Sequence, residues 1–208
     1  MLNSFLANWN SLYNNHVATI VNTIAQVHEN DVSAHFTDLF ININRAVSLP
    51  SRDLDAFSLF GAINNKNCDG AFLIEIQYGV FDLVFIELKS GYDTEKLFDA
   101  KEQVLYSLPK LNILLSSVKD YSRLSIRKTY GIIVSLSPDD NDLNWIQGKF
   151  NLPRNQWGKH TCGLKLYQDR HIEVDTPNLC IDSKYLPKKF DLYYFESQAD
   201  NLTIDLPV

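Results

Sequence analysis

Cysteine is scarce in this chain, with three residues in 208. Cys68, Cys162 and Cys180 are far apart in the sequence, odd in number and form no Cys-x-x-Cys pair. A disulfide-stabilised protein needs a denser, even set of cysteines, and a structural zinc site needs closely spaced ligands. The sequence therefore predicts neither, and we interpret the three thiols as reduced.

Long apolar segments are also absent. No segment reaches the roughly 18 consecutive apolar residues that a membrane-spanning helix requires. Residues 1–30 have no basic start, no continuous apolar run and no small-residue cleavage site, so they do not have the pattern of a secretory signal. We expect a soluble, cytoplasmic protein that does not bind a membrane.

The chain has no excess of positive charge. Its formal net charge is −6, whereas a domain that coats nucleic acid typically has a pI above about 9. It also lacks a Gly-rich phosphate loop, which disfavours a nucleotide-binding enzyme. A nuclease is still compatible with this balance, because carboxylates that bind a metal add negative charge and basic contacts can be local. Two basic groups either contact phosphates or form solvated faces: Lys119, Arg123, Arg127 and Lys128, and Lys184, Lys188 and Lys189.

Apolar residues at three- and four-residue steps predict that helices open the chain. One amphipathic pattern covers residues 5–27, and a second begins after the polar residues at 30–33 and ends at Pro50. A short apolar segment at 56–63, followed by a turn-rich loop, predicts a first strand. A chain of 208 residues can bury one substantial core, so we expect a single domain over residues 1–208.

A β-hairpin is predicted next. Two β-rich segments, residues 71–76 and 80–88, are separated by Gln77, Tyr78 and Gly79. Three-residue hairpin loops commonly need positive φ at the third position, which Gly79 provides. The loop length then fixes the register and pairs Ile76 with Val80. A two-residue turn would shift this register.

The predicted register brings carboxylates together. Counting outward from the turn places Asp69 opposite Glu87 on one face of the sheet. Lys89 points to the same face because side chains alternate along a strand. Glu75 shares this face and is interpreted as a solvated rim residue, whereas Asp82 falls on the other face and is interpreted as structural.

A helix is predicted over residues 93–115, followed by a buried strand at 130–136. Weaker patterns predict two strand pairs, 163–167 with 172–175 and 190–195 with 202–206. The predicted buried face of the helix consists of Leu97, Ala100, Val104, Leu108 and Leu111.

Two neighbouring carboxylates repel each other, and one lysine compensates only in part, so a divalent cation is the natural partner. Magnesium prefers oxygen ligands and usually takes one or two protein carboxylates together with phosphate oxygens. Such an ion would polarise a phosphodiester and activate a water, and Lys89 would orient that water. The residues thus point to phosphodiester hydrolysis with Mg²⁺, for which Mn²⁺ can substitute.

Asp69, followed by Glu87-Leu88-Lys89 on a hairpin and then a helix, resembles the PD-(D/E)XK nuclease superfamily, which includes restriction enzymes, repair and recombination nucleases. The resemblance covers residues 29–136. It implies an α/β, restriction-endonuclease-like αβββαβ core with a central mixed sheet flanked by helices. Residues 139–208 would then be a C-terminal elaboration and the source of substrate specificity.

The resemblance also implies roles for particular residues. Asp69, Glu87 and the backbone carbonyl of Leu88 would be metal ligands, and Lys89 would assist the attacking water. Many members place a further acidic residue on an early helix near the metal, for which Glu29 is the candidate. Cys68 stands where the motif name has proline.

Gln103 and Tyr106 on the following helix resemble the glutamine and tyrosine of the RecB-like branch, although they are three residues apart here and four apart in that branch. They either orient the site and contact a phosphate, or are ordinary exposed helix residues.

The expected function is therefore a magnesium-dependent DNA endonuclease of restriction, defence or mobile-element type. Cutting both strands of a duplex makes a homodimer plausible. Two alternatives remain open: a non-catalytic module that keeps the nuclease fold and binds nucleic acid or protein, and an α/β small-ligand or immunity-type protein in which the acidic pair is incidental.

Overall fold

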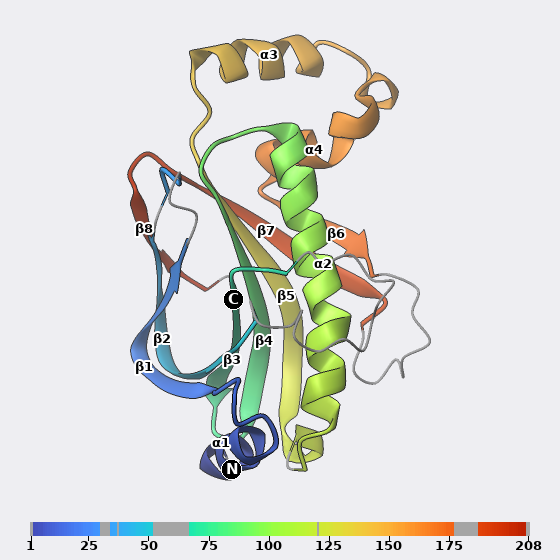
Figure 1. Ribbon diagram of the computed structural model, residues 1–208. Helices are drawn as coiled ribbons and strands as arrows, with labels where there is room; N and C mark the ends of the chain where they lie inside the picture. Colours follow the sequence, from blue (N-terminus) through green and yellow to red (C-terminus); the bar gives the residue numbers. More distant parts are fainter. Residues whose placement is uncertain are drawn as a thin grey trace.

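The computed structural model describes residues 2–29, 34–36, 38–51, 67–119, 121–176 and 187–206. These residues form an α/β structure in which helices flank a mixed sheet of eight strands (Figure 1). The predicted α/β class with a central mixed sheet is therefore confirmed. Every helix in those ranges is too short or too polar to span a membrane.

The elements follow one another in a simple order along the chain. They are α1 (Leu2–Leu12), β1 (Thr19–His28), β2 (Asp38–Leu49), β3 (Gly70–Gln77), β4 (Val80–Lys89), α2 (Thr94–Ser116), β5 (Ser125–Leu136), α3 (Asp140–Phe150), α4 (Thr161–Asp169), β6 (His171–Asp175), β7 (Lys189–Ser197) and β8 (Asn201–Asp205). Short 3-10 turns lie at Tyr121–Arg123, Arg154–Gln156 and Gly158–His160.

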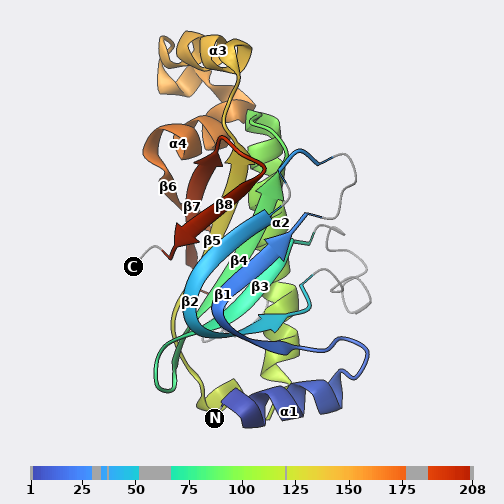
Figure 2. The same cartoon turned by 90° about the vertical axis from the view of Figure 1, so that its left-hand side faces the viewer.

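The strands are arranged in the order β1-β2-β3-β4-β5-β7-β6, and β8 pairs with β2 off this path. Strands β2, β3 and β4 form an antiparallel meander, and α2 then crosses over to β5, which is parallel to β4. The C-terminal half of β2 pairs with β3 and its N-terminal half pairs with β8. Strands β1, β2 and β8 therefore curl away from β3, β4 and β5, on the side opposite α2 (Figures 1 and 2).

This curl gives the sheet an apolar cluster on each face. On the side of α2, residues such as Leu83, Phe85 and Ile133 pack against α1, α2 and α4. On the other side, the curled strands enclose a second cluster that includes Val84 and Ile132. Strand β4 and residues 130–135 of β5 are buried on both faces, which explains their nearly continuous apolar sequences.

The hairpin differs from its prediction at the turn but not at the site. Gln77 pairs with Val80, so Tyr78 and Gly79 form a two-residue turn, and Gly79 has the expected positive φ of 78°. The register then shifts between Glu75 and Gln77, after which the pairing follows the predicted register. This register shift compensates for the shorter turn, so the residues farther along β3 and β4 are paired as predicted.

Helix α2 is confirmed, with Asp93 as the N-cap that accepts a hydrogen bond from the backbone N–H of Glu95 at 2.7 Å. The helix lies close to the sheet at Gly131 of β5, where an added Cβ would come within 2.7 Å of Val104 Cγ1 and Leu192 Cδ1. All five residues of the predicted apolar face are buried: Leu97, Ala100, Val104, Leu108 and Leu111.

The predicted N-terminal helices are wrong beyond Leu12. A turn at residues 13–16 ends α1, and the chain continues as strands β1 and β2. Both strands are rich in β-branched residues such as Ile20 and Ile41, which favour a pleated surface over a helix. In β2 the buried Leu39 and Ile41 alternate with more exposed neighbours, which is the period of a strand. The strand predicted at 56–63 lies outside the described residues.

Later elements are partly confirmed. Strand β5 includes the predicted 130–136 segment, and β6, β7 and β8 occur where strands were predicted. Residues 163–167, predicted as a strand, lie instead in helix α4, whose Gly163 packs against Thr94 of α2. The predicted pairings also change, because β6 pairs with β7 and β8 pairs with β2.

We expect Gly131→Ala to destabilise the protein by about 1–3 kcal/mol, because its methyl group would force α2 and β7 away from β5. Urea unfolding followed by circular dichroism measures this change. Gly148→Ala on exposed α3 is the matched control, since nothing lies within 4 Å of its added Cβ and alanine favours a helix. Equal stability of Gly131→Ala and the wild type would contradict the close helix–sheet contact.

Candidate functional site

The site lies where the C-terminal end of β4 passes under α2. Glu87 follows the alternation of Leu83 and Phe85, so it points to the α2 side of the sheet and is only 1% exposed. Lys89 continues the same alternation at the last residue of β4. A carboxylate and an ammonium group are therefore held at the edge of an apolar layer, where the dielectric is low and their charges act strongly.

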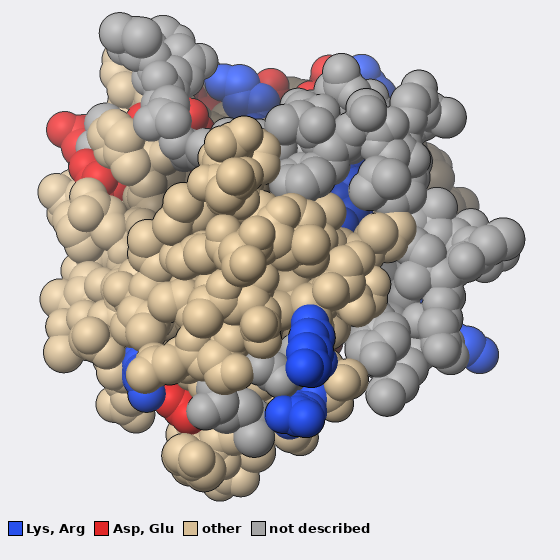
Figure 3. Space-filling view, turned by 60° about the horizontal axis from the view of Figure 1, so that its bottom comes forward, with Lys and Arg blue, Asp and Glu red and all other residues tan. Residues whose placement is uncertain are grey.

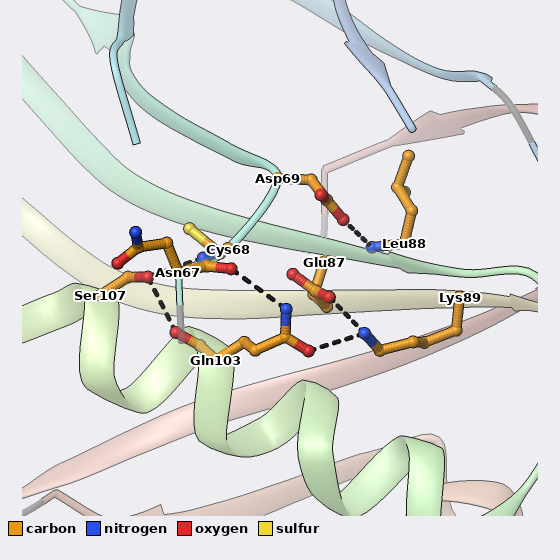
Figure 4. A network of polar contacts seen from close by, with 8 residues as sticks. All are labelled: Asn67, Cys68, Asp69, Glu87, Leu88, Lys89, Gln103 and Ser107. Carbon is orange, nitrogen blue, oxygen red and sulfur yellow. Dashed lines mark hydrogen bonds and ion pairs between the residues drawn. The ribbon is translucent and has the colours of Figure 1, made fainter. Parts of the chain in front are cut away.

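The Lys89 ammonium group bridges β4 and α2. It lies 2.5 Å from Glu87 Oε1 and donates a hydrogen bond to Gln103 Oε1 at 2.6 Å. Figure 4 shows this row of side chains between the strand and the helix. The interaction with two acceptors fixes the direction of Lys89 and leaves its side chain 19% exposed.

Gln103 also connects the helix to the segment before β3. Its amide donates to the backbone oxygen of Asn67 at 3.1 Å, and Lys110 Nζ donates to Asn67 Oδ1 at 2.8 Å. One turn after Gln103, the Ser107 hydroxyl donates to the Gln103 carbonyl and accepts from the backbone N–H of Cys68. These contacts fix residues 67–69 against α2 and thereby position Asp69 (Figure 4).

Asp69 comes directly before β3 and faces the end of β4. Its Oδ2 accepts a hydrogen bond from the backbone N–H of Leu88 at 2.8 Å. Its charge raises the pKa of Glu87, so the two carboxylates influence each other electrostatically. The predicted meeting of Asp69 with Glu87 and Lys89 at one site agrees with this arrangement.

Both carboxylates open into one cavity of about 510 Å³. Glu29, which follows the last residue of β1, lines the cavity too, but it lies at the end of a strand and not on the predicted early helix. Tyr106 is not among the lining residues. The complete lining consists of Glu29, His35, Asp69, Glu87, Leu88, Lys89, Ser90, Lys96, Asp99 and Gln103.

Several residues in or next to the cavity were not predicted. Asn67 and His35 carry no local sequence signal, since each is brought to the site by the fold. The polar stripe of α2 could have been predicted from the sequence, because its residues recur at three- and four-residue steps along one helix face. That stripe consists of Lys96, Asp99, Gln103, Ser107 and Lys110.

Burial dominates the electrostatics of Glu87. It raises the pKa of the Glu87 carboxyl well above its ordinary value, and the charges of Asp69 and Glu29 raise it further, whereas Lys89 lowers it. Glu87 Oε2 is buried and has no hydrogen-bond partner. Burial also raises the pKa of Cys68 to about 12, which disfavours the reactive thiolate form.

The donor set fits a hard cation such as magnesium. A buried carboxylate oxygen without a hydrogen-bond partner costs free energy unless another group binds it, and Glu87 Oε2 is such an atom. The two carboxylates match the number that magnesium usually takes from a protein, with water and phosphate completing its shell. Within the described ranges, no cluster of three or more His, Cys, Asp or Glu residues is arranged to hold a metal.

Asp82, on the same strand as Glu87, differs from it in that both of its carboxylate oxygens have a hydrogen-bond partner. It is also 1% exposed, but Arg127 donates to both of its oxygens, at 3.0 and 2.6 Å. Val84 and Ile86, which share its side of the strand, pack on the face opposite Glu87, as predicted. Glu75 accepts a hydrogen bond from the backbone N–H of Gly79 and lies away from the cavity lining.

Comparison of the chain with protein-family models, with curated proteins and with solved structures finds no match to any of them.

We expect Glu87→Gln to unfold at a higher temperature than the wild type at about pH 8 in chelator. The raised pKa means that the folded state binds the Glu87 proton more tightly than the unfolded chain does. Ionisation therefore costs stability as pH rises above the ordinary glutamate pKa of about 4.3. The advantage should vanish below about pH 3, where both the folded and the unfolded states are protonated. Thermal unfolding at several pH values measures it.

Asp82→Asn is the matched control, because both Asp82 oxygens have a partner in Arg127. We expect it to lose about 1–3 kcal/mol at neutral pH. Destabilisation of both variants by the same amount would contradict the different roles of the two carboxylates.

Proposed function

We propose that this protein is a magnesium-dependent nuclease that hydrolyses phosphodiester bonds. The observation that carries the proposal is the buried Glu87 carboxylate, with one oxygen on Lys89 and the other without a hydrogen-bond partner, in the cavity that Asp69 also lines. Strongly perturbed carboxylates in a cavity are typical of functional sites. A purely structural ion pair would normally satisfy both oxygens, as Asp82 does.

The order of elements around the site supports the same proposal. The meander β2-β3-β4, the crossover helix α2 and the parallel strand β5 follow the βββαβ part of the restriction-endonuclease-like core. Asp69, directly before β3, and the Glu87-Leu88-Lys89 segment at the end of β4 are the residues on which the PD-(D/E)XK resemblance rests, and their proximity supports the proposal. An early helix directly before the meander is not part of the agreement, because β1 stands there.

Asp69, Glu87 and the Leu88 carbonyl would hold the magnesium ion, with Glu29 as a further acidic residue of the cavity. The ion, when bound, would polarise the scissile phosphodiester and lower the pKa of the attacking water. Manganese would serve the same role. The backbone N–H of Leu88 keeps the Asp69 carboxylate oriented toward the strand end.

Lys89 is the group of this chain that acts on the water and on developing charge. Its ammonium group would orient the attacking water and stabilise negative charge on the phosphate oxygens. Gln103 is a positioning residue, since its side-chain oxygen Oε1 accepts a hydrogen bond from the Lys89 ammonium group at 2.6 Å. Tyr106 has no such contact with the site, so the proposal assigns it no role.

The substrate class proposed is nucleic acid, with DNA favoured by the resemblance to restriction and recombination enzymes. An endonuclease of restriction, defence or mobile-element type is the corresponding biological role. Lys96 is the second cation of the cavity and is available for a phosphate next to the scissile one.

We expect the protein to cleave DNA with magnesium or manganese and to bind calcium with little turnover, because calcium holds water and phosphate in a looser shell. Glu87→Ala should weaken metal binding by about tenfold or more. Lys89→Ala should keep metal binding and lower the cleavage rate by about a hundredfold or more. Gel-based cleavage of DNA and RNA substrates measures activity, and titration calorimetry with manganese measures binding.

Glu75→Ala is the control, since Glu75 lies on the same hairpin but away from the cavity. It should change neither measurement. If the wild type binds DNA or another macromolecule but cleaves no substrate with any metal, the chain is a non-catalytic module and the proposal fails.

A further inference from the structure

Strand β1 forms one edge of the sheet. Among the described residues its hydrogen-bonded neighbour is β2, so its outer side presents backbone N–H and C=O groups without a strand partner. Ten residues of extended chain span about 33 Å, and β1 is ten residues long. An edge of this length is a template for pairing with another strand.

The residues of β1 do little to prevent such pairing. Its sequence, TIVNTIAQVH, contains no Lys, Arg, Asp, Glu or Pro, the residues that usually protect a sheet edge. The opposite edge, β6, is five residues long, and ion pairs join it to β7: Glu173 with Lys189, and His171 with Asp191. The edge strands β6 and β8 are therefore short, with five residues each, whereas β1 has ten residues and its ion pair, of His28 with Asp38, lies at its last residue.

The N-terminal segment that contains α1 and β1 also lacks charged residues. Residues 1–28 contain no Asp, Glu, Lys or Arg, although the whole chain has a net charge of −6. Helix α1 lies at the bottom of Figure 1, and the view from that side shows a broad surface made of neither acidic nor basic side chains (Figure 3). Three apolar residues of α1, of β1 and of the segment between them are exposed: Leu12, Val17 and Ile24, at 52%, 55% and 49%.

One irregularity divides the edge. Thr23 has a positive φ of 69° and lies at a register shift between Asn22 and Ile24, which is the geometry of a β-bulge. The segment after it pairs regularly with β2 from Ile24 to His28. Before the bulge, the side chain of Asn10 holds the backbone of Ala18 through two hydrogen bonds and fixes the start of β1 on α1.

We propose that β1 pairs antiparallel with β1 of a second copy of this chain, so that two sheets join into one across a two-fold axis. Antiparallel pairing of identical edges closes after two copies, and the five-residue edges β6 and β8 are too short to offer a comparable site for growth. An uncharged contact surface also lets two chains of net charge −6 approach without like charges facing each other. The inference is independent of the proposed nuclease activity.

Sedimentation velocity of the wild type and of Ile24→Lys tests the proposal. We expect a dimer for the wild type and a dimer dissociation constant raised by about tenfold or more in the variant, because lysine charges would meet at the paired edges. The Ile24 side chain is 49% exposed in the protomer, so the substitution leaves the fold intact. Tyr78→Lys, at the hairpin turn and 87% exposed, is the matched control and should remain dimeric.

Hydrogen exchange of β1 amides provides a second measurement. They should be protected in the wild-type dimer and exchange faster in Ile24→Lys, whereas the amides of β4 should not change. Asn22→Lys serves as the second edge variant if Ile24→Lys fails to fold. A monomeric wild type at the highest soluble concentration, or a dimer that both edge variants leave intact, would overturn the proposal.

Discussion

The contact of the Lys89 ammonium group with Glu87 and Gln103 is the interaction on which the site depends. It joins the end of a central strand to the helix that covers it, and Gln103 extends the connection to Asn67 before the neighbouring strand. Without this lysine, α2 would lie over a buried carboxylate with no cation beside it. The same contact therefore compensates the charge of Glu87 and sets the position of residues 67–69.

That interaction is possible because α2 lies close to the sheet at Gly131. Gly131 has no side chain to keep the helix away, and Val104 fills the space above it. A short distance between helix and strand lets the amide of Gln103, on the same helix, reach Lys89. The apolar packing at one turn of α2 thus determines a polar contact at the adjacent position.

The sequence predicted the central elements and the meeting of Asp69, Glu87 and Lys89, but not the N-terminal third. The positive φ of Gly79 and the alternation of β4 are local signals, and both were predicted correctly. The register at Asp69 came out right although the predicted three-residue loop was wrong, because the irregularity next to Ile76 compensates for the shorter turn. At the N-terminus, apolar residues at steps of three and four suggested helices, and the β-branched content of β1 and β2 was the better signal.

Other features could be found only in three dimensions. The pairing of β8 with β2 joins residues more than a hundred positions apart, and the approach of Glu29 and His35 to the cavity follows from the curl of β1 and β2. The helix α3 did carry a local signal, a capping box between Asp139 and Asp142, that the periodicity of its few apolar residues did not reveal. Its Ile146 is the buried residue of the helix, so a hydrophobic stripe was too weak to predict it.

Strand β4 carries two carboxylates, Asp82 and Glu87, that are equally buried on opposite faces. Their hydrogen-bond partners differ, and this difference distinguishes a structural carboxylate from one suited to bind a ligand. Arg127 satisfies both oxygens of Asp82, so this pair resembles a structural solution to burying a charge. The lysine beside Glu87 also donates a hydrogen bond to Gln103, and the charge of Asp69 repels the Glu87 carboxylate. One oxygen of Glu87 has no hydrogen-bond partner. Packing alone would favour an apolar residue at this position, as at Phe85 two residues earlier. An acidic residue that costs stability at the wall of a cavity is best explained by what it binds there.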